Sequence, residues 1–294
     1  MRLDSALRDL NVFSSRNKAK EAILRGEVLY DGRLFDRPAI EITRQGGELF
    51  FQDRVFDITL LRTEPYFVSR AGYKLAGFLL DYANGVLQDL EAFIRDFMTT
   101  KTNETLLNAT DIIHALRSLQ IDECMDSNAL DVGVGTGGFS EVLLACGARH
   151  ITCVDVGDKL SDKLRADSRI SYFGNCDIRD FARDFIENPH QKSAFDVIVC
   201  DVSFISLTSI VDVLSCLNAR TLILLFKPQF EVGRAVKRNK KGVISDKDSI
   251  AHSLRSFSEI LRPTHNLLFT TSHILGKEGN VEIFILATRK NPPK

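Results

Sequence analysis

Short apolar runs alternate with stretches of helical periodicity throughout the C-terminal part of the chain. A strand that is apolar along its whole length is buried on both faces, and helices between such strands are typical of a parallel sheet covered on both sides. The pattern therefore predicts an α/β fold with a mostly parallel sheet, whose last two strands pair as a hairpin at the sheet edge. In chain order the predicted strands are NALDVG, HITCVDV, RISYF, FDVIVCDV, TLILLF, LLFTTSH and VEIFILATR, with a long helix from Asp246 to Leu261 before the last two.

A smaller unit with a different pattern occupies the N-terminus. Apolar residues among the first 25 positions follow helical spacing in two pieces, and Ser14 or Ser15 in the break can cap the second helix. Short alternating strands follow, with a hairpin signal at Asp31-Gly32. This order predicts a small α+β domain.

Domain boundaries follow from these two patterns. We expect the small domain to cover residues 1–61 and the α/β domain to cover residues 62–294. In the second domain SRAGYKLAGFLLDY is predicted to form a helix that carries Lys74. The stretch 84–128 that follows is helical in parts and polar in the middle, and we interpret it as an insert before the first strand.

The bulk composition excludes several classes of protein. A formal net charge of -1 argues against a nucleic-acid coat protein but leaves room for a local basic face. The six cysteines include no Cys-x-x-Cys pair, so we expect small core residues and neither a disulfide framework nor a metal site. The N-terminus is too charged for a secretory signal, and no apolar run reaches the length of a membrane span, which predicts a cytoplasmic protein.

A glycine-rich loop, ALDVGVGTGGF, leaves the first strand of the α/β pattern. Glycines let the backbone turn sharply and approach a ligand closely at a helix N-terminus. The spacing fits both the dinucleotide fingerprint and the loop of S-adenosylmethionine-dependent methyltransferases, and both need an acid at the end of the next strand. The motif alone does not choose between these cofactors. The predicted cofactor-binding residues are Asp131, Gly133, Gly135, Gly137, Gly138, Phe139, Asp155, Asp177 and Asp201.

The end of the fourth strand, FDVIVCDVSFISL, distinguishes between classes of methyltransferase. Enzymes that methylate exocyclic amines place a Pro-Pro-aromatic turn here, and the sequence DVSF that starts at Asp201 has no proline. Cys200 lies inside the strand, so it is a poor candidate for the nucleophile of a pyrimidine-carbon methyltransferase. A carboxylate, Asp201, remains at this strand end, and Lys227 follows at the next, where ligands of parallel sheets bind.

Lys227 suits the methylation of a ribose 2′-hydroxyl, which needs a base near a weak acid. A desolvated lysine near another cation such as Lys74 has a lowered pKa and can accept that proton, whereas a nearby carboxylate opposes the shift and orients the ammonium. Glu282 stands at the start of the final strand and reaches the same sheet end if that strand runs antiparallel to its neighbours. The sequence does not determine how these effects balance.

Basic residues dominate the first twenty positions, where five cations stand against two carboxylates. Cations on two adjacent helices can bind the phosphates of a nucleic acid, and an ordinary solvated face is the alternative. The predicted RNA-binding residues are Arg2, Arg16, Lys18 and Lys20.

Nine motifs in order resemble the TlyA family, bacterial proteins that pair an RNA-binding module like that of a ribosomal small-subunit protein with an FtsJ-like ribose methyltransferase. The resemblance covers nearly the whole chain. Its motifs are RLDSALRDL, SRNKAKEAILRGEVLYDGRLFDRP, VSRAGYKL, LDVGVGTGGF, VDVG, DVSFISL, KPQFEVGR, KGVISD and GNVE.

The resemblance implies a Rossmann-like methyltransferase domain, S-adenosylmethionine as cofactor and 2′-O-methylation of cytidine in ribosomal RNA or ribosomal subunits. It also implies a catalytic set with Lys227 as the base and the other members orienting it and the hydroxyl. That set falls on Lys74, Asp201, Lys227 and Glu282.

The chain departs from the family pattern in several places. Ala71 stands where a glycine is usual, and Asp162 stands where a tryptophan is usual. The stretch 84–128 replaces a short connection, and we expect a surface elaboration. The start at MRLD resembles the shorter members, which act on large-subunit RNA only. Members also carry a haemolysin label, but no membrane-spanning or strongly amphipathic element stands outside the core segments, so we do not expect a pore.

Two other functions fit parts of the sequence. A catalytically silent protein with the cofactor fold would act in ribosome assembly through its basic helices, and a Lys227→Ala variant with unchanged cellular function would favour it. A nicotinamide-dependent oxidoreductase would use the glycine loop for NAD, and binding of NAD alone would favour that function. The target nucleotide, the form of the RNA substrate and the oligomeric state do not follow from the sequence.

Overall fold

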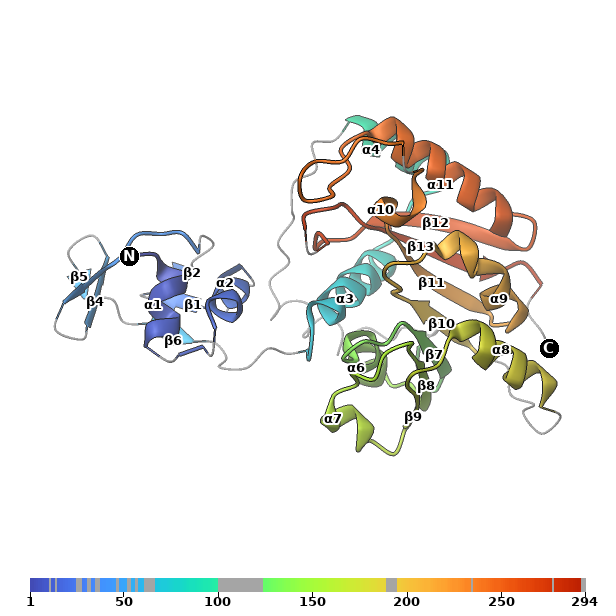
Figure 1. Ribbon diagram of the computed structural model, residues 1–294, viewed down its shortest axis with the longest axis horizontal. Helices are drawn as coiled ribbons and strands as arrows, with labels where there is room; N and C mark the ends of the chain where they lie inside the picture. The colour runs from blue at the N-terminus through green and yellow to red at the C-terminus, as the bar shows by residue number, and fades with distance from the viewer. Residues whose placement is uncertain are drawn as a thin grey trace. The chain divides into compact units, whose positions relative to one another are not determined.

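A computed structural model of the protein is shown in Figure 1. Contacts between Cα atoms divide the chain into two compact units, one built on Met1–Tyr66 and the other beginning at Phe67, and each unit is described by itself. The expected boundary between residues 61 and 62 lies outside the described residues. The structure describes every residue except Asn11, Ser14, 25–27, 31–32, 35–37, 46–47, 52–53, 56–57, 61–66, 100–123, 189–194, Arg234, Lys277 and 292–294.

The first unit begins with two short helices followed by short strands. Its elements are α1 (Leu3–Asp9), α2 (Arg16–Leu24), β1 (Val28–Tyr30), β2 (Arg33–Leu34), β3 (Thr43–Gln45), β4 (Glu48–Phe51), β5 (Arg54–Val55) and β6 (Ile58–Leu60). Ser15 caps α2 as expected, because its Oγ accepts a hydrogen bond from the backbone N–H of Lys18 (3.2 Å). β1 and β2 pair antiparallel with Tyr30 opposite Arg33, as a hairpin requires, although the two predicted turn residues lie outside the described residues. Apolar residues of α1 and α2 form one small core with Ile42.

A seven-stranded sheet organises the second unit. Its strands are β7 (Asn128–Val132), β8 (His150–Val154), β9 (Ile170–Phe173), β10 (Val197–Cys200), β11 (Thr221–Phe226), β12 (His265–Thr271) and β13 (Ile283–Arg289). The spatial order is β12-β13-β11-β10-β7-β8-β9, and all neighbours are parallel except β13, which is antiparallel to β11 and β12. This sheet confirms the predicted fold class and the final hairpin, with β12 at the edge and β13 one strand inside it.

The direction in which strands are added reverses between β7 and β10. Strands β8 and β9 extend the sheet on one side of β7, and β10 begins the other side. In open α/β sheets, ligands bind outside the carboxyl ends of the strands at such a reversal. The glycine loop leaves β7 and Asp201 leaves β10, so both lie at this ligand-binding edge.

Helices cover both faces of the sheet (Figure 1). They are α3 (Arg70–Ala83), α4 (Leu90–Thr99), α6 (Gly138–Ala145), α7 (Asp162–Arg165), α8 (Ile178–Glu187), α9 (Val211–Cys216), α10 (Pro228–Glu231) and α11 (Lys247–Leu261), with a 3-10 turn η1 at Leu207–Ser209. α3 and α6 lie on one face, where the rings of Phe78 and Phe139 stack on Phe284 of β13. α4, α8, α9 and α11 share a core with the other face, to which Ile283 and Ile285 belong. Among the described residues, no helix combines the length and apolar character needed to span a bilayer.

Part of the expected insert belongs to this core. α4 contributes four buried residues, Leu90, Phe93, Ile94 and Phe97. Their spacing places them on one side of a helix, which packs against β12 and α11. The expectation that the whole stretch 84–128 is a surface elaboration is therefore wrong for α4, because an amphipathic helix of this kind is stable only with its apolar face covered.

Candidate active site

Lys227 and Asp201 form an ion pair where two parallel strands end. Lys227 Nζ lies 2.5 Å from Asp201 Oδ1 and donates a hydrogen bond to Ser203 Oγ (2.8 Å). Lys227 is only 6% exposed, so these partners offset the cost of burying its ammonium group. Pro228 restricts the preceding residue to extended backbone, and Lys227 has φ -114° and ψ 99°. The proline therefore ends the strand and helps to fix the direction of the lysine.

A second buried ion pair joins helix α3 to the start of β13. Lys74 Nζ lies 2.6 Å from Glu282 Oε2, and the two residues are 8% and 3% exposed. Gly276 lies directly against the carboxylate, since a Cβ at that position would come within 2.6 Å of Glu282 Oε1. A side chain at this position would have to displace the carboxylate or the turn before β13.

The strand register brings both pairs to one end of the sheet. In the antiparallel ladder of β11 and β13, Phe226 faces Ile283, so the chain continues to Lys227 on one strand and to Glu282 on the other. Ala71, which replaces the expected glycine in the first turn of α3, leaves the Lys74 pair intact. The structure thus brings together all four predicted catalytic residues, Lys74, Asp201, Lys227 and Glu282.

The glycine loop packs against the backbone of Asp201. Gly133 has φ +78°, and a Cβ there would lie 2.8 Å from the Asp201 carbonyl oxygen. Gly137 has φ +101° and is the N-terminal cap of α6. Left-handed backbone of this kind favours glycine. A side chain at Gly133 would separate the loop from the end of β10, and one at Gly137 would clash with Leu164 of α7.

Asp155, at the end of β8, fixes the glycine loop through its backbone. Its Oδ2 accepts a hydrogen bond from Gly135 N–H (2.8 Å), and its Oδ1 accepts one from Gly157 N–H (2.6 Å). Each carboxylate oxygen has a further lone pair with which to accept a hydroxyl hydrogen of a ligand. The predicted acid therefore holds the loop and can also bind a ribose.

Asp131 is a buried carboxyl group with one oxygen lacking a partner. Oδ2 accepts a hydrogen bond from Ser140 Oγ (2.6 Å), whereas Oδ1 has no hydrogen-bond partner among the described residues. Burial raises the pKa of Asp131 to about 7; the Ser140 hydrogen bond lowers it, and the nearby charge of Asp201 raises it further. An unpartnered buried polar atom is costly, so a donor group of a ligand would stabilise it.

Two residues of the predicted cofactor-binding set, Asp177 and Phe139, have side chains that make structural contacts. Asp177 caps α8 by accepting the N–H of Arg179 (2.9 Å), and the Arg179 guanidinium (2.7 Å) holds the pKa of this carboxyl below its ordinary value. Phe139 is 2% exposed, and its ring centroid lies 6.2 Å from that of Phe284. The side chain of Phe139 is therefore a core contact between α6 and β13, which leaves the backbone of this residue for the predicted cofactor contact.

Two residues that the sequence analysis missed join the loops around the ion pairs. Glu231 at the end of α10 accepts hydrogen bonds from Leu207 N–H (2.6 Å) and Ser206 Oγ (2.6 Å), which ties the segment after Lys227 to the segment after β10. Asn280, just before β13, accepts a hydrogen bond from Ile244 N–H (3.0 Å). Both stand in quoted motifs, KPQFE and GNVE, but only the folded loops reveal their partners.

Phe204 presents an exposed aromatic ring beside the Lys227 pair. Its exposure is 89%, and its φ of +71° is unusual for a bulky residue. The ring centroid of Phe230 lies 5.8 Å away. Such backbone strain costs about 1–3 kcal/mol and occurs at functional sites, and exposed aromatic faces stack on unpaired bases. The sequence signal was its place directly after Ser203, at a strand end.

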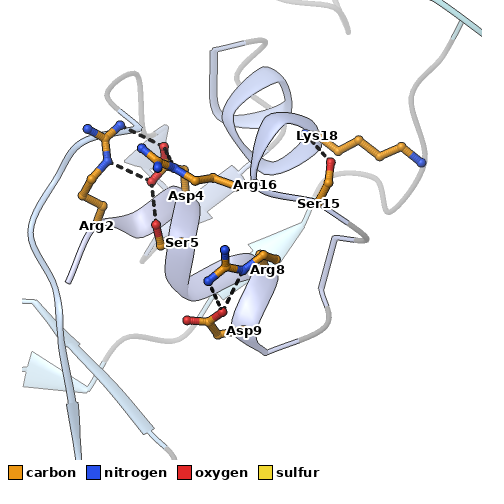
Figure 2. Close-up of polar contacts among 8 residues, drawn as sticks. All are labelled: Arg2, Asp4, Ser5, Arg8, Asp9, Ser15, Arg16 and Lys18. Carbon is orange, nitrogen blue, oxygen red and sulfur yellow. Dashed lines mark hydrogen bonds and ion pairs between the residues drawn. The ribbon is translucent and has the colours of Figure 1, made fainter.

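Figure 2 shows three of the four predicted RNA-binding residues of the first unit, Arg2, Arg16 and Lys18. Asp4 is fully buried and pairs with Arg2 (2.9 Å) and Arg16 (3.1 Å), whose side chains are 44% and 48% exposed. Burial raises the pKa of Asp4, but the hydrogen bonds from Arg2 and Arg16 outweigh this effect and hold it below the ordinary value. Lys18 and Lys20 on α2 are exposed. All four cations therefore remain accessible, and two of them are oriented by one buried carboxylate.

Comparisons with known proteins agree with this geometry. Residues 106–290 match the FtsJ-like methyltransferase family and residues 1–45 match the S4 domain. The chain is 35% identical over 281 residues to the Campylobacter jejuni 23S rRNA (cytidine-2′-O)-methyltransferase TlyA, covering 92% of each chain. It is 28% identical to the Mycobacterium tuberculosis 16S/23S rRNA (cytidine-2′-O)-methyltransferase TlyA, covering 97% of this chain and 88% of that one. A solved structure of a protein named as a hemolysin from Streptococcus thermophilus shares the fold, with a TM-score of 0.58, 24% identity and coverage of 100% of this chain and 90% of that one.

Proposed function

The chain belongs to the TlyA family of FtsJ-like methyltransferases, and from this premise we propose that it methylates a cytidine ribose 2′-hydroxyl in large-subunit ribosomal RNA with S-adenosylmethionine as methyl donor. The observation that carries the proposal is the buried Lys227–Asp201 pair at the end of the sheet where the glycine loop begins. Large-subunit RNA is favoured because the 35% identical relative is named for 23S rRNA.

Lys227 acts as the base in the proposed reaction. In its neutral form Nζ accepts the proton of the ribose hydroxyl, and the ammonium that results is stabilised by Asp201 at 2.5 Å and oriented by Ser203 at 2.8 Å. Lys74 and Glu282 orient the hydroxyl from the other side of the β11–β13 ladder. Each pair contains one positive and one negative charge, so the site needs no counter-ion from solvent.

The residues around the glycine loop fit S-adenosylmethionine. Asp131 Oδ1 is a buried acceptor for an amino group, Asp155 offers lone pairs to ribose hydroxyls, and Gly133 lets the loop approach closely. When bound, S-adenosylmethionine supplies a methyl group from a sulfonium, a transfer that depends mainly on positioning. Membership in a methyltransferase family removes the nicotinamide-dependent alternative.

A ribose target fits the site better than a pyrimidine carbon. Cys200 is fully buried inside β10, and burial raises the pKa of its thiol strongly, so it is unsuited to attack a base. Phe204 offers a face on which the base of the target nucleotide stacks. The S4 match and the cations around Asp4 support RNA binding by the first unit.

Label transfer tests the proposal. The protein is incubated with methyl-labelled S-adenosylmethionine and unmodified large subunits or free rRNA, and the RNA is then digested with alkali. A 2′-O-methyl group blocks cleavage at its own phosphodiester, so label in an alkali-resistant dinucleotide is expected. Label in mononucleotides would point to a base and refute the proposed role of Lys227. RNA binding without label on any RNA form would instead favour the ribosome-assembly factor.

A further inference from the structure

The segment between α10 and α11 is the most one-sided stretch of charge in the second unit. Between Glu231 and Asp246 the sequence has five basic residues and no acidic one, although the whole chain carries a net charge of -1. We use the term basic loop for residues 237–243, KRNKKGV, within it. Three of its lysines, Lys237, Lys240 and Lys241, are exposed.

These three lysines lie close together in one loop and have no carboxylate partner among the residues described. Within the described part of the chain, none of the three ammonium groups forms an ion pair or a hydrogen bond. Elsewhere in the unit, six exposed arginines are paired with neighbouring acids. These pairs are Arg149–Asp126, Arg165–Asp158, Arg169–Asp167, Arg179–Asp177, Arg183–Asp180 and Arg255–Glu91. The basic loop is thus a local positive field on a nearly neutral protein.

The loop is held in one shape by its remaining polar residues. The guanidinium of Arg238 donates hydrogen bonds to the carbonyls of Val236 (2.9 Å) and Val232 (3.4 Å) and so turns back to α10. Asn239 Oδ1 accepts the N–H groups of Lys241 (2.8 Å) and Val243 (3.0 Å), which closes the tip. One basic side chain therefore fastens the loop, and the lysines stay free for a ligand.

Asn280 ties the basic loop to the catalytic end of the sheet. Its buried side chain accepts the N–H of Ile244 (3.0 Å), directly after the loop, and reaches the carbonyl of Gly242 (3.5 Å). Two residues later the same segment carries Glu282, the partner of Lys74. The loop begins ten residues after Lys227, and Arg238 ties this end to the segment that follows α10.

A ribose 2′-hydroxyl in RNA is adjacent to the 3′-phosphodiester of the same nucleotide. An enzyme that acts on it must accept phosphates around its site, and the two buried ion pairs, being neutral, do not attract them. We infer that the basic loop is a second RNA-binding element, in which Lys237, Lys240 and Lys241 bind backbone phosphates that flank the target nucleotide. The inference rests on the proposed function for its substrate class, and it adds an RNA contact in the catalytic unit to those expected in the first unit.

The test replaces the three lysines together, as Lys237→Gln, Lys240→Gln and Lys241→Gln, in the full chain. The matched control removes three exposed cations at the opposite end of the sheet, as Arg220→Gln, Arg262→Gln and Lys290→Gln. Binding of an unmodified rRNA fragment is measured between 50 and about 200 mM salt, because each lost phosphate contact lowers the slope of log affinity against log salt by about 0.7–0.9. The loop variant should lose about two in slope, and the control should keep the slope of the unaltered protein.

Steady-state kinetics give a second readout. We expect the loop variant to raise the KM for RNA about tenfold at 0.15 M salt, with kcat at saturating RNA and affinity for S-adenosylhomocysteine unchanged. An unchanged slope and KM would overturn the inference. Weaker binding to intact subunits but not to naked RNA would also overturn it and indicate an acidic protein surface. Because the slope needs no turnover, an unaltered protein that binds RNA through the loop but transfers no label would refute the proposed function alone.

Discussion

The ammonium of Lys227 lies 2.5 Å from the Asp201 carboxylate, where β11 and β10 end side by side. Proton acceptance at Nζ depends on this contact, since Asp201 stabilises the protonated base. We predict that Lys227→Ala lowers kcat by about 10²–10⁴-fold, the usual contribution of a general base, with little change in cofactor affinity. Single-turnover methylation of rRNA measures the rate, and Lys290→Ala at the other end of the sheet is the control.

Asp201→Asn tests whether the two residues act as a unit. The amide keeps the shape but cannot stabilise the ammonium, so we expect a loss in kcat similar to that of Lys227→Ala. The double variant should then be no worse than Lys227→Ala alone, because interacting residues are not additive. Fully additive losses would show that Lys227 and Asp201 contribute separately.

The buried Lys74–Glu282 pair should contribute to the free energy of unfolding. Both groups are buried, so Glu282→Ala leaves an unpaired ammonium and should lower the free energy of unfolding by about 3–5 kcal/mol. Replacing both, as Lys74→Met with Glu282→Leu, removes the stranded charge and should restore most of that stability without restoring methylation. Urea unfolding followed by circular dichroism measures the first effect and the label assay the second. If the double variant methylates normally, the pair has no part in the reaction.

Asp131 makes the stability of the protein depend on pH. Its pKa is raised from 3.8 to about 7 by burial, so the folded state holds a proton that the unfolded state has lost. This contribution to stability is complete below pH 3.8 and is lost progressively as the pH rises to about 7, above which the loss is constant. The total is on the order of 4 kcal/mol as an upper bound. We expect Asp131→Asn to be the more stable protein at pH 8 and to show a flatter profile between pH 4 and about 7 in urea titrations.

Glu231 should position the loop that carries Ser203. Its carboxylate accepts hydrogen bonds from Ser206 and Leu207, three to four residues beyond Ser203. Ser203 in turn accepts a hydrogen bond from Lys227, the proposed general base. Glu231→Ala should loosen this loop and lower kcat about tenfold, by the loss of orientation, while the KM for S-adenosylmethionine stays the same. Glu231→Gln keeps one acceptor oxygen and should recover part of the rate. Equal damage by both substitutions, with a lower melting temperature, would indicate a purely structural role.

The sequence predicts the sheet and the strand-end positions of three catalytic candidates because both depend on local pattern, whereas the complete set, with Lys74 on α3, is what the family resemblance implies. Buried strands are continuous apolar runs, and Lys227, Asp201 and Glu282 are polar residues at their ends, so chain direction alone brings them together. The catalytic roles themselves remain predictions. The packing of the Phe139 side chain in the core was not predictable, because an apolar residue after a glycine loop has the same pattern whether its side chain contacts a cofactor or the core.

Hydrogen bonds between loops could not be predicted in the same way. Glu231 and Asn280 bind backbone groups of segments 24 and 36 residues away in sequence, and no periodicity encodes such partners. The polar stretch TTKTNET, which follows α4, led to the expectation that the whole segment lies at the surface. The apolar spacing of α4 itself is that of a packed helix.

Lys20 and Arg16 are both exposed cations of the first unit, but only Arg16 also pairs with a buried carboxylate, so their substitutions should have different effects. Lys20 is exposed on α2, so Lys20→Ala should weaken RNA binding and lower the slope of log affinity against log salt by about 0.7–0.9 for one phosphate contact. Arg16 also pairs with the buried carboxylate of Asp4, so Arg16→Ala should lower that slope and reduce the stability of the unit as well. Arg16→Lys keeps the charge but not the Nε–H donor, and it should retain the salt slope while losing part of the stability. Filter binding across a salt series and thermal unfolding measure the two effects, and salt slopes identical to that of the unaltered protein would show that α2 does not anchor the RNA.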